Sequence, residues 1–312
     1  MMRSCSLHSR TSSALTAIAS VMFLSLGAAC SATPGPGGGD GLPLGTGGTG
    51  PAISPECTET PACSGAEFDK NGNPAVCVQT VDADVVNESG DPAAGFFAQV
   101  CAANICKNAK ADEQGHLHIV VCKNMVNPAF KIPGKSKYGS IAVPVTESIM
   151  ALGTYKLVPL STGATQLPPT LDKDTTFTSG GAVLTLTAGT EVKINEVDHP
   201  DPEDQMFRAA YIPTDGAPGL AESSPNLELF YGLAPTGTKL SKGANLTVPN
   251  FNKWPSGAQV QFFVQGMDPA GGVNGPAGQW TQAGDGRVSD DGKTISTSSS
   301  IKYLSLIGVG LK

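Results

Sequence analysis

Three cysteines and two histidines lie in the segment from Cys101 to Cys122, and these residue types could bind a metal or take part in redox chemistry. Structural zinc sites usually carry cysteine pairs separated by about two to four residues, and the four residues between Cys101 and Cys106 lie at the limit of that spacing. A redox centre needs a Cys-x-x-Cys motif or an exposed thiol of lowered pKa. The sequence contains no Cys-x-x-Cys motif, which favours another use of the cysteines.

Disulfide bonds are the use that we expect. Apart from two cysteines near the N-terminus, the chain has an even set of cysteines within one short stretch: Cys57, Cys63, Cys77, Cys101, Cys106 and Cys122. An even set of this kind in an exported chain is typical of a disulfide framework. The sequence therefore predicts that all six are paired, and about 15 connectivities stay open.

The two histidines occupy alternate positions of a strand-like run. His116 and His118 alternate with Leu117, Ile119 and Val121, which is the pattern of a strand with one buried face. The apolar residues are expected to face a core and the histidines to face water. The segment therefore predicts a disulfide-stapled hairpin of a β-sandwich, with a zinc site or a histidine-only metal site as the alternatives.

The N-terminus has the pattern of an export signal. Arg3 and Arg10 precede a run of apolar and small residues that ends before Cys30, which is the arrangement of a secretory signal peptide. An apolar run of roughly 16 to 18 residues with these flanks is too short for a stable membrane span. We predict a signal peptide at residues 1–29 and no transmembrane helix after it.

The end of this signal, LSLGAAC, resembles the lipobox of bacterial lipoproteins, in which the cysteine is acylated and becomes the new N-terminus. The resemblance implies lipidation at Cys30 and a membrane as partner through this lipid anchor. Gly27 stands where the family usually has a bulky apolar residue. Ordinary signal cleavage after Ala29 is the alternative.

A linker and an acidic charge balance follow. Residues 30–56 are predicted to form a disordered linker, because nine glycines and five prolines between Ser31 and Pro55 cannot build a core. Removal of residues 1–29 takes away two arginines and no acids, which leaves 18 basic and 27 acidic residues and a net charge of about −9. This balance excludes nucleic acid as an expected partner.

The rest of the chain is rich in strand patterns and poor in helical ones. Alternating and β-branched runs are separated by turn segments such as KNGNP and NESGDP, which predicts a mainly β fold of antiparallel β-sandwich-like modules. Pro168 and Pro169 interrupt this pattern. We predict a disulfide-stapled module at 57–167 and a second β-rich module at 168–312, in which GDGRVSDDGK forms short strands around Asp-Gly turns.

A family resemblance supports the first of these modules. VQTVDADVVNESGDPAAGFFAQVC, with the KADEQGHLHIVVC that follows it, resembles the carboxypeptidase-regulatory-like, transthyretin-like family in its turns at Gly90 to Pro92 and Asp112 to Gly115. The resemblance covers about 90 residues, implies a sandwich fold and implies almost nothing about function. With the lipobox and this module together, the chain resembles lipoproteins of the myxobacterial type.

Motifs for catalysis are weak. PGKS at 133–136 imitates the end of a phosphate-binding loop, but Ala129 stands where that loop needs a glycine. A Ser-His-Asp triad would have few bases to use, since the chain after the signal has only three histidines, and neither G-x-S-x-G nor H-E-x-x-H occurs. The loop from Asp198 to Asp204 has the carboxylates that calcium prefers, but its prolines favour a solvated turn. No metal and no cofactor is expected.

Two tryptophans are the remaining candidates for ligand contact. Trp254 and Trp280 lie near loops rich in glycine and asparagine, where an exposed ring could stack on a sugar, and core packing is the alternative. We predict a non-catalytic lipoprotein of the cell envelope, anchored at the outer membrane, with an envelope protein or a polysaccharide as partner. A carbohydrate-binding accessory module is the second hypothesis, and an enzyme with a dispersed site is the third.

Overall fold

The structure of the chain is a computed structural model. It describes residues 54–57, 75–103, 105–162, 165–196, 198–220, 223, 226–268, 272 and 274–312. Cys30, Cys63, the predicted signal peptide and most of the predicted linker lie outside these ranges. Within them, no helix combines the length and the apolar character that crossing a membrane requires.

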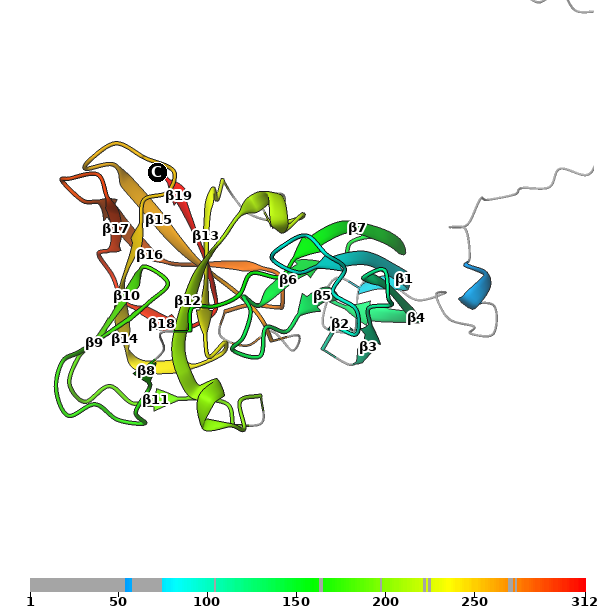
Figure 1. The fold of residues 1–312 in the computed structure, drawn as a ribbon, viewed down its shortest axis with the longest axis horizontal. Coiled ribbons are helices and arrows are strands. Elements are labelled where there is room, and N and C mark those ends of the chain that lie inside the picture. Colours follow the sequence, from blue (N-terminus) through cyan, green and yellow to red (C-terminus); the bar gives the residue numbers. More distant parts are fainter. Residues whose placement is uncertain are drawn as a thin grey trace, which may run out of the picture. The chain divides into compact units, whose positions relative to one another are not determined.

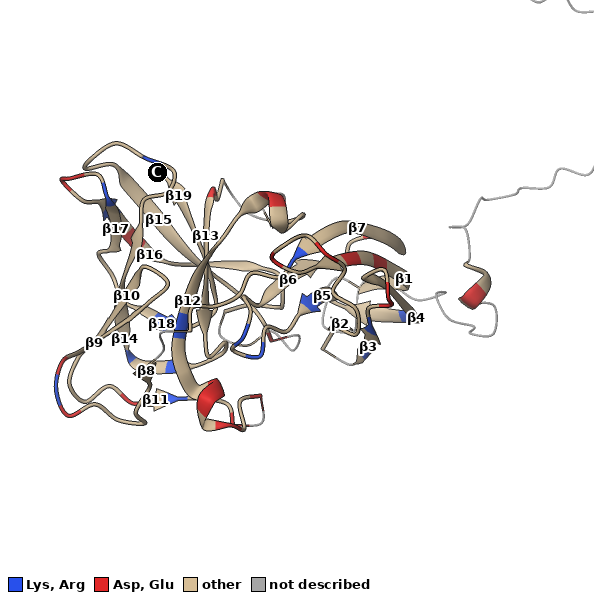
Figure 2. Cartoon of the chain, viewed as in Figure 1, with Lys and Arg blue, Asp and Glu red and all other residues tan. Residues whose placement is uncertain are grey.

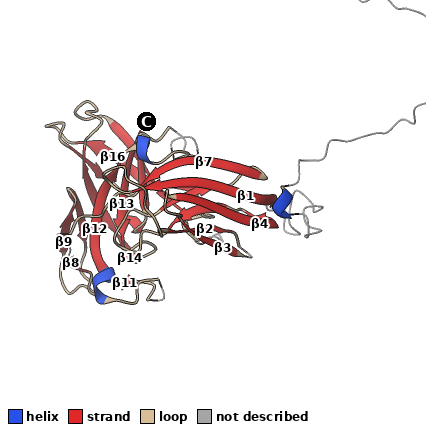
Figure 3. Cartoon of the chain, turned by 45° about the vertical axis from the view of Figure 1, so that its right-hand side comes forward, coloured by secondary structure: helices blue, strands red, loops and turns tan. Residues whose placement is uncertain are grey.

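The described chain is mainly β, which confirms the predicted fold class (Figure 1). Helical structure in these ranges is confined to short 3-10 turns (Figure 3), namely η1 (Pro55–Cys57), η2 (Pro202–Gln205) and η3 (Thr214–Gly216). The strands form two small sheets and one large one.

The two small sheets come from the first half of the described chain. One has the order β4 (His116–Val126), β1 (Ala75–Val86), β7 (Ile149–Lys156), with β4 antiparallel and β7 parallel to β1. The other has the antiparallel order β3 (Cys106–Lys110), β2 (Phe97–Cys101), β5 (Ala129–Ile132), β6 (Ile141–Pro144). Their apolar faces share one buried cluster. In this cluster, the ring centroids of Phe130 on β5 and Tyr155 on β7 lie 5.3 Å apart.

The alternation predicted for β4 is confirmed. Leu117, Ile119 and Val121 are buried, and the two histidines between and before them are exposed. Burying every second residue of a strand places one whole face against the core. The histidines therefore lie on the outer face of the three-stranded sheet.

The predicted hairpin between Cys101 and Cys122 is wrong, because β3 and β4 belong to different sheets. The turn before β4 carries the chain from one sheet to the other. At its end, Gly115 has a φ of +81°, and a Cβ atom there would lie 2.5 Å from the carbonyl oxygen of Val85. Only glycine fits this position, so the turn is a corner between two sheets.

Disulfides reinforce this half of the structure. Cys101 pairs with Cys106 and closes the β2–β3 hairpin, while Cys57 pairs with Cys122 and fixes η1 to β4. Cys77 is also disulfide-bonded. The prediction that these cysteines form disulfides is confirmed for the described residues.

The second half of the chain forms the large antiparallel sheet. Its strands follow the order β8 (Thr165–Gln166), β12 (Met206–Ile212), β13 (Leu229–Ala234), β19 (Leu306–Leu311), β15 (Gln259–Gln265), β16 (Trp280–Val288), β17 (Thr294–Thr297), β14 (Lys239–Pro249), β10 (Ala182–Leu186), β9 (Thr175–Ser179). Two short strands, β11 (Val192–Lys193) and β18 (Ile301–Tyr303), also pair with β14. The two ends of the sheet approach each other, since the backbone N–H of Ala209 on β12 donates to the Ser179 hydroxyl of β9 at 3.0 Å.

Two kinds of contact join the halves. Leu220, Phe230 and Leu306 of the second half belong to the same buried cluster as the small sheets. Gln265 at the end of β15 is fully buried, and its amide accepts the backbone N–H of Ala142 at 3.1 Å and donates to the carbonyl oxygen of Ala142 at 2.8 Å. Because β6 ends its sheet, this amide takes the place of a further strand. The boundary between 57–167 and 168–312 stays a prediction.

Candidate functional site

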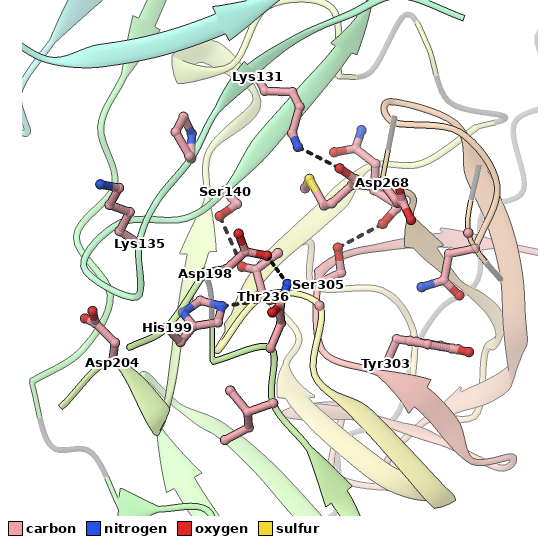
Figure 4. Close-up of a pocket in the computed structure, with 18 of the residues that line it drawn as sticks. Lys131, Lys135, Ser140, Asp198, His199, Asp204, Thr236, Asp268, Tyr303 and Ser305 are labelled. Atoms are coloured by element: carbon pink, nitrogen blue, oxygen red, sulfur yellow. Dashed lines mark hydrogen bonds between the residues drawn. The ribbon is translucent and has the colours of Figure 1, made fainter. Parts of the chain in front are cut away.

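A cleft of about 1060 Å³ lies where the small sheets meet the large one (Figure 4). Its first side is formed by β2, β5 and the loop from 133 to 140. Its second side is formed by described residues of the segments 194–196, 198–204, 236–237, 267–268, 272 and 274–275, together with β18. The residues that line it include Phe97, Lys131, Lys135, Lys137, Lys193, Asn195, Asp198, His199, Asp201, Asp204, Thr236, Lys239, Gln265, Asp268, Tyr303 and Ser305.

The loop after β5 folds as a tight turn at the edge of the cleft. The N–H groups of Lys137 and Tyr138 both donate to the carbonyl oxygen of Gly134, at 2.9 and 3.0 Å. The N–H of Gly134 donates to the Ser140 hydroxyl at 3.0 Å. A Cβ atom at Gly134 would lie 1.8 Å from the carbonyl oxygen of Tyr138, so this close approach requires glycine.

A buried histidine ties this turn to the opposite side of the cleft. His199 is 3% exposed; its Nε2 lies 2.9 Å from the carbonyl oxygen of Thr236 and its Nδ1 lies 3.1 Å from the Ser136 hydroxyl oxygen. A carbonyl oxygen can only accept, so Nε2 carries a proton and donates it to Thr236. Ser136 also lies 2.6 Å from the carbonyl oxygen of Asp204. This network joins three loops that are far apart in the sequence.

Ser136 and His199 lie as close together as a catalytic serine and its general base, but Ser136 is not accessible to a substrate. Ser136 is 2% exposed and does not line the cleft, whereas a nucleophile must reach the substrate. Its hydroxyl group has one proton, which it can donate either to the imidazole of His199 or to the carbonyl oxygen of Asp204. This arrangement positions loops, and it supports a structural role for both residues.

Charged side chains of both signs surround the cleft. The lysines at 131, 135, 137, 193 and 239 and the aspartates at 198, 201, 204 and 268 line it. Figure 2 shows basic residues on β5 and the loop after it, and acidic residues around η2. Lys131 donates from Nζ to the carbonyl oxygen of Met267 at 2.7 Å, and burial lowers the pKa of its ammonium group. The cleft is therefore polar, and its most buried cation has no counterion within ion-pair distance in the described structure.

Hydroxyl and amide groups fill the space between these charges. Thr236 and Ser140 share a hydrogen bond at 3.1 Å across the cleft (Figure 4), and the Ser305 hydroxyl donates to the carbonyl oxygen of Gln265 at 2.8 Å. Tyr303 is partly exposed on the second side. Ser140, Thr236 and Ser305 lie in loops between strands, and together with Tyr303 on β18 they give the cleft a polar, partly aromatic lining.

The two predicted contact tryptophans lie outside this cleft. Trp254 is 7% exposed and belongs to the core of the large sheet. Trp280 is partly buried, and its ring centroid lies 5.7 Å from that of Phe230. Its indole N–H is buried and has no hydrogen-bond partner among the described residues. Core packing, the alternative considered for both rings, accounts for their placement.

His116 and His118 do not face only water, because they meet carboxylates across the β1–β4 pair. His118 Nδ1 lies 2.6 Å from Asp82 and its Nε2 lies 2.8 Å from Glu56 of η1. His116 Nδ1 lies 3.0 Å from Asp84. Since carboxylates only accept, the His118 ring is held by two donated hydrogen bonds, which favours its protonated form. The hydrogen bond to Asp82, followed by that to Glu56, raises the pKa of His118.

This raised pKa predicts a stability that falls with rising pH. A histidine whose folded pKa lies above its unfolded value of about 6.5 stabilises the fold fully below that value, and the contribution is lost as pH rises through the folded pKa. Because His118 and both carboxylates are partly exposed, the effect should be below about 1 kcal/mol. Urea unfolding from pH 5.5 to 8.5 should show a steeper loss in the native protein than in His118→Gln. Identical slopes in both would contradict this assignment.

Metal ligands do not gather in the described structure. No group of three or more histidine, cysteine, aspartate or glutamate side chains there has the arrangement of a metal site. Asp198 belongs to the loop that was considered as a calcium site, and its carboxylate accepts a hydrogen bond from the side-chain amide of Asn195 at 2.6 Å. The segment from Asp198 to Asp204 lines the cleft. The sequence predicted a solvated turn here, but the side chain of His199 is buried.

The sequence reasoning missed the cleft residues because they come from six separate segments. PGKS at 133–136 was interpreted only as an incomplete phosphate-binding loop, and His199 only as one of three possible bases and as part of the acidic loop considered for calcium. The usable signal was the closeness of three lysines, Lys131, Lys135 and Lys137, in a chain of net charge −7. Local enrichment of the minority charge marks a candidate binding surface.

No family model matches the chain, and no match is found among curated proteins or solved structures. The carboxypeptidase-regulatory-like character of the first module therefore stays a prediction from the sequence.

Proposed function

We propose that this protein is an exported, non-catalytic binding component of the bacterial cell envelope, and that its ligand occupies the cleft. The observation that carries the proposal is the cleft itself, which is large, polar and formed by loops that hydrogen bonds tie together. Binding sites are usually preformed concave surfaces of this size. Ser136, the serine that lies within hydrogen-bond distance of His199, is buried and does not line the cleft, which favours binding over turnover.

Export is supported by the N-terminal pattern and by the disulfides. Arg3, Arg10 and the apolar run up to Cys30 have the features of a signal peptide, and disulfides persist in oxidising compartments. Lipidation at Cys30 would anchor the protein to the outer membrane. Intact mass of the protein from envelope fractions tests this part, because acyl chains on Cys30 add a large, fixed mass, whereas a mass beginning at Ser31 or at an unmodified Cys30 would contradict it.

Carbohydrate binding is the second candidate, and one observation favours it. Tyr303 is partly exposed and lines the same cleft as Asn195. Sugar recognition combines an aromatic ring, on which the C–H face of a sugar packs, with planar polar groups that bind hydroxyls. This moves the expected sugar contact from the two tryptophans to Tyr303.

Binding to a polysaccharide panel tests the second candidate. Tyr303→Ala should weaken saccharide binding about fivefold, since the loss of a ring contact costs on the order of 1 kcal/mol. Trp280→Ala is the matched control, because Trp280 lies outside the cleft and its loss should act on stability and leave affinity unchanged. Retained affinity in Tyr303→Ala with lost affinity in a folded Trp280→Ala would place the sugar site elsewhere.

A further inference from the structure

We propose that the cleft recognises an acidic polysaccharide, and that Lys131, Lys135 and Lys137 bind its carboxylate groups. These three residues are called the cationic wall below. The inference rests on the proposed function of the cleft as a binding site and names the chemical class of its ligand.

The ammonium groups of the cationic wall are available for a ligand. Lys135 and Lys137 are exposed, and in the described part of the chain their side chains have neither a hydrogen-bond nor an ion-pair partner. Lys131 uses one of its three N–H donors on the carbonyl oxygen of Met267. Burial has the larger effect on the pKa of the Lys131 ammonium and lowers it, whereas the charges of Asp198 and Asp268 act to raise it. Lys131 has no ion pair in the described structure, so its partly buried ammonium still gains from an anion that enters the cleft.

The turn that carries Lys135 and Lys137 is fixed before any ligand arrives. Lys135 and Ser136 have φ values of +43° and +58°, which non-glycine residues adopt only when the surroundings hold them. The hydroxyl of Ser136 is held by the carbonyl oxygen of Asp204 and by His199. The buried serine thus anchors the turn and leaves the two neighbouring lysines outside. A fixed turn lowers the entropy cost of binding.

The opposite side of the cleft suits the hydroxyl groups of a sugar. Asp198 and Asp204 present carboxylate oxygens there, and Figure 4 shows Asp198 beside His199 and Thr236. Carboxylates accept charge-assisted hydrogen bonds from hydroxyls. The cationic wall on the first side and the aspartates on the second, where Lys193 and Lys239 also lie, therefore match a polymer that carries both carboxylates and hydroxyls. A neutral glucan would leave the cationic wall unused.

A peptide is a poorer match for the same cleft. Extended peptides bind mainly by adding a strand to a free sheet edge. The edge strand beside the cleft is β6, and the N–H and carbonyl groups of Ala142 on β6 are already taken by Gln265. The backbone there offers no strand-pairing site at this residue, so side-chain recognition of a polymer is favoured.

The proposal is tested by changing the carboxylate charge of a polysaccharide while its backbone stays the same. Calorimetry of the purified protein with polygalacturonate and with its fully methyl-esterified form compares the same chain with and without carboxylates. Polygalacturonate should bind at least tenfold more tightly, and its affinity should fall at high salt because screening weakens exposed charge pairs. The Lys135→Gln/Lys137→Gln variant should lose about tenfold or more in affinity for polygalacturonate. Lys173→Gln/Lys293→Gln removes the same charge from exposed lysines outside the cleft and should bind as the native protein does.

Each other outcome overturns the proposal in a distinct way. Equal binding of the esterified polymer would remove the charge inference and leave saccharide binding standing. If neither polymer binds but the polysaccharide panel identifies a neutral ligand, the charge inference is also removed and saccharide binding stands. Failure of both polymers and of the panel would remove carbohydrate binding as well. Equal binding of poly-glutamate, with the same dependence on Lys135 and Lys137, would assign the cleft to acidic peptides.

Discussion

Replacing Cys57 and Cys122 together by alanine should lower the free energy of unfolding by about 4 kcal/mol. The two cysteines are separated by 65 residues, and the entropy that a cross-link removes from the unfolded chain grows with the length of the loop that it closes. The bond also fixes η1 beside His118, so the loss should include part of the Glu56 contact. Urea unfolding followed by tryptophan fluorescence measures the change.

The Cys101–Cys106 disulfide is the matched control. Its cysteines are five residues apart, and the same chain-entropy reasoning gives about 2 kcal/mol for its removal. A double alanine variant at these positions should therefore cost roughly half as much. Equal losses in the two variants would contradict the loop-length account, and no loss in either would mean that the bonds do not support the described fold.

Replacing Gln265 by leucine should cost about 2 to 6 kcal/mol of unfolding free energy. Leucine is close in volume but leaves both backbone groups of Ala142 without partners, and a buried unsatisfied group costs about 1 to 3 kcal/mol. Because Gln265 joins β15 to β6 at the cleft, the variant should also bind the cleft ligand more weakly. Urea unfolding and calorimetry on the same variant measure both effects.

Gln259→Leu provides the comparison on the same strand. Gln259 is exposed, and the hydrogen bond from its side chain, to the carbonyl oxygen of Gly257, is long, at 3.5 Å, so its replacement should change stability by less than about 0.5 kcal/mol. A similar cost for the two variants would show that the Gln265 amide does not hold β15 and β6 together.

The sequence predicted the faces of strands better than their partners. The period of two in HLHIVV assigns Leu117 and Ile119 to the core and His118 to the outside, because alternation depends only on the strand's own geometry. Pairing depends on distant segments: β4 pairs with β1 and not with its neighbour β3. The turn residues at 112–115 indicate a reversal of the chain, but a hairpin and a corner between sheets use the same residue types.

The two Asp-Gly pairs of the second half illustrate the same limit. Asp291 and Gly292 form the predicted turn between β16 and β17, and Gly292 has a φ of +72°. Gly286, in contrast, lies within β16, where a Cβ atom would be 2.4 Å from the ring of Phe262. The prediction of a turn at Asp285-Gly286 is therefore wrong. A glycine can be required by close packing as well as by a turn, and only the tertiary structure distinguishes the two.

The candidate site was harder to predict than the fold. Ser136 and His199 are 63 residues apart, and neither has a motif that indicates the other. The two tryptophans were predicted as ligand contacts because aromatic rings occur both in protein cores and in sugar-binding sites. Only the burial of the ring in the folded structure distinguishes the two. What the sequence could reveal was the lysine cluster at 131–137 in an acidic chain; the aspartates that face it come from loops that the fold brings near.

Amide chemical-shift mapping with trigalacturonate tests the central claim most directly. Titration of the isotope-labelled protein should shift the amide signals of residues around the cleft, above all Lys135, Asp198, Thr236 and Tyr303. The exposed aromatic patch at Phe251, which is 51% exposed and lies 4.6 Å from Tyr211 between ring centroids, should be unaffected. Shifts confined to Phe251 and its neighbours, or no shifts at millimolar ligand, would contradict the assignment of the cleft as the binding site.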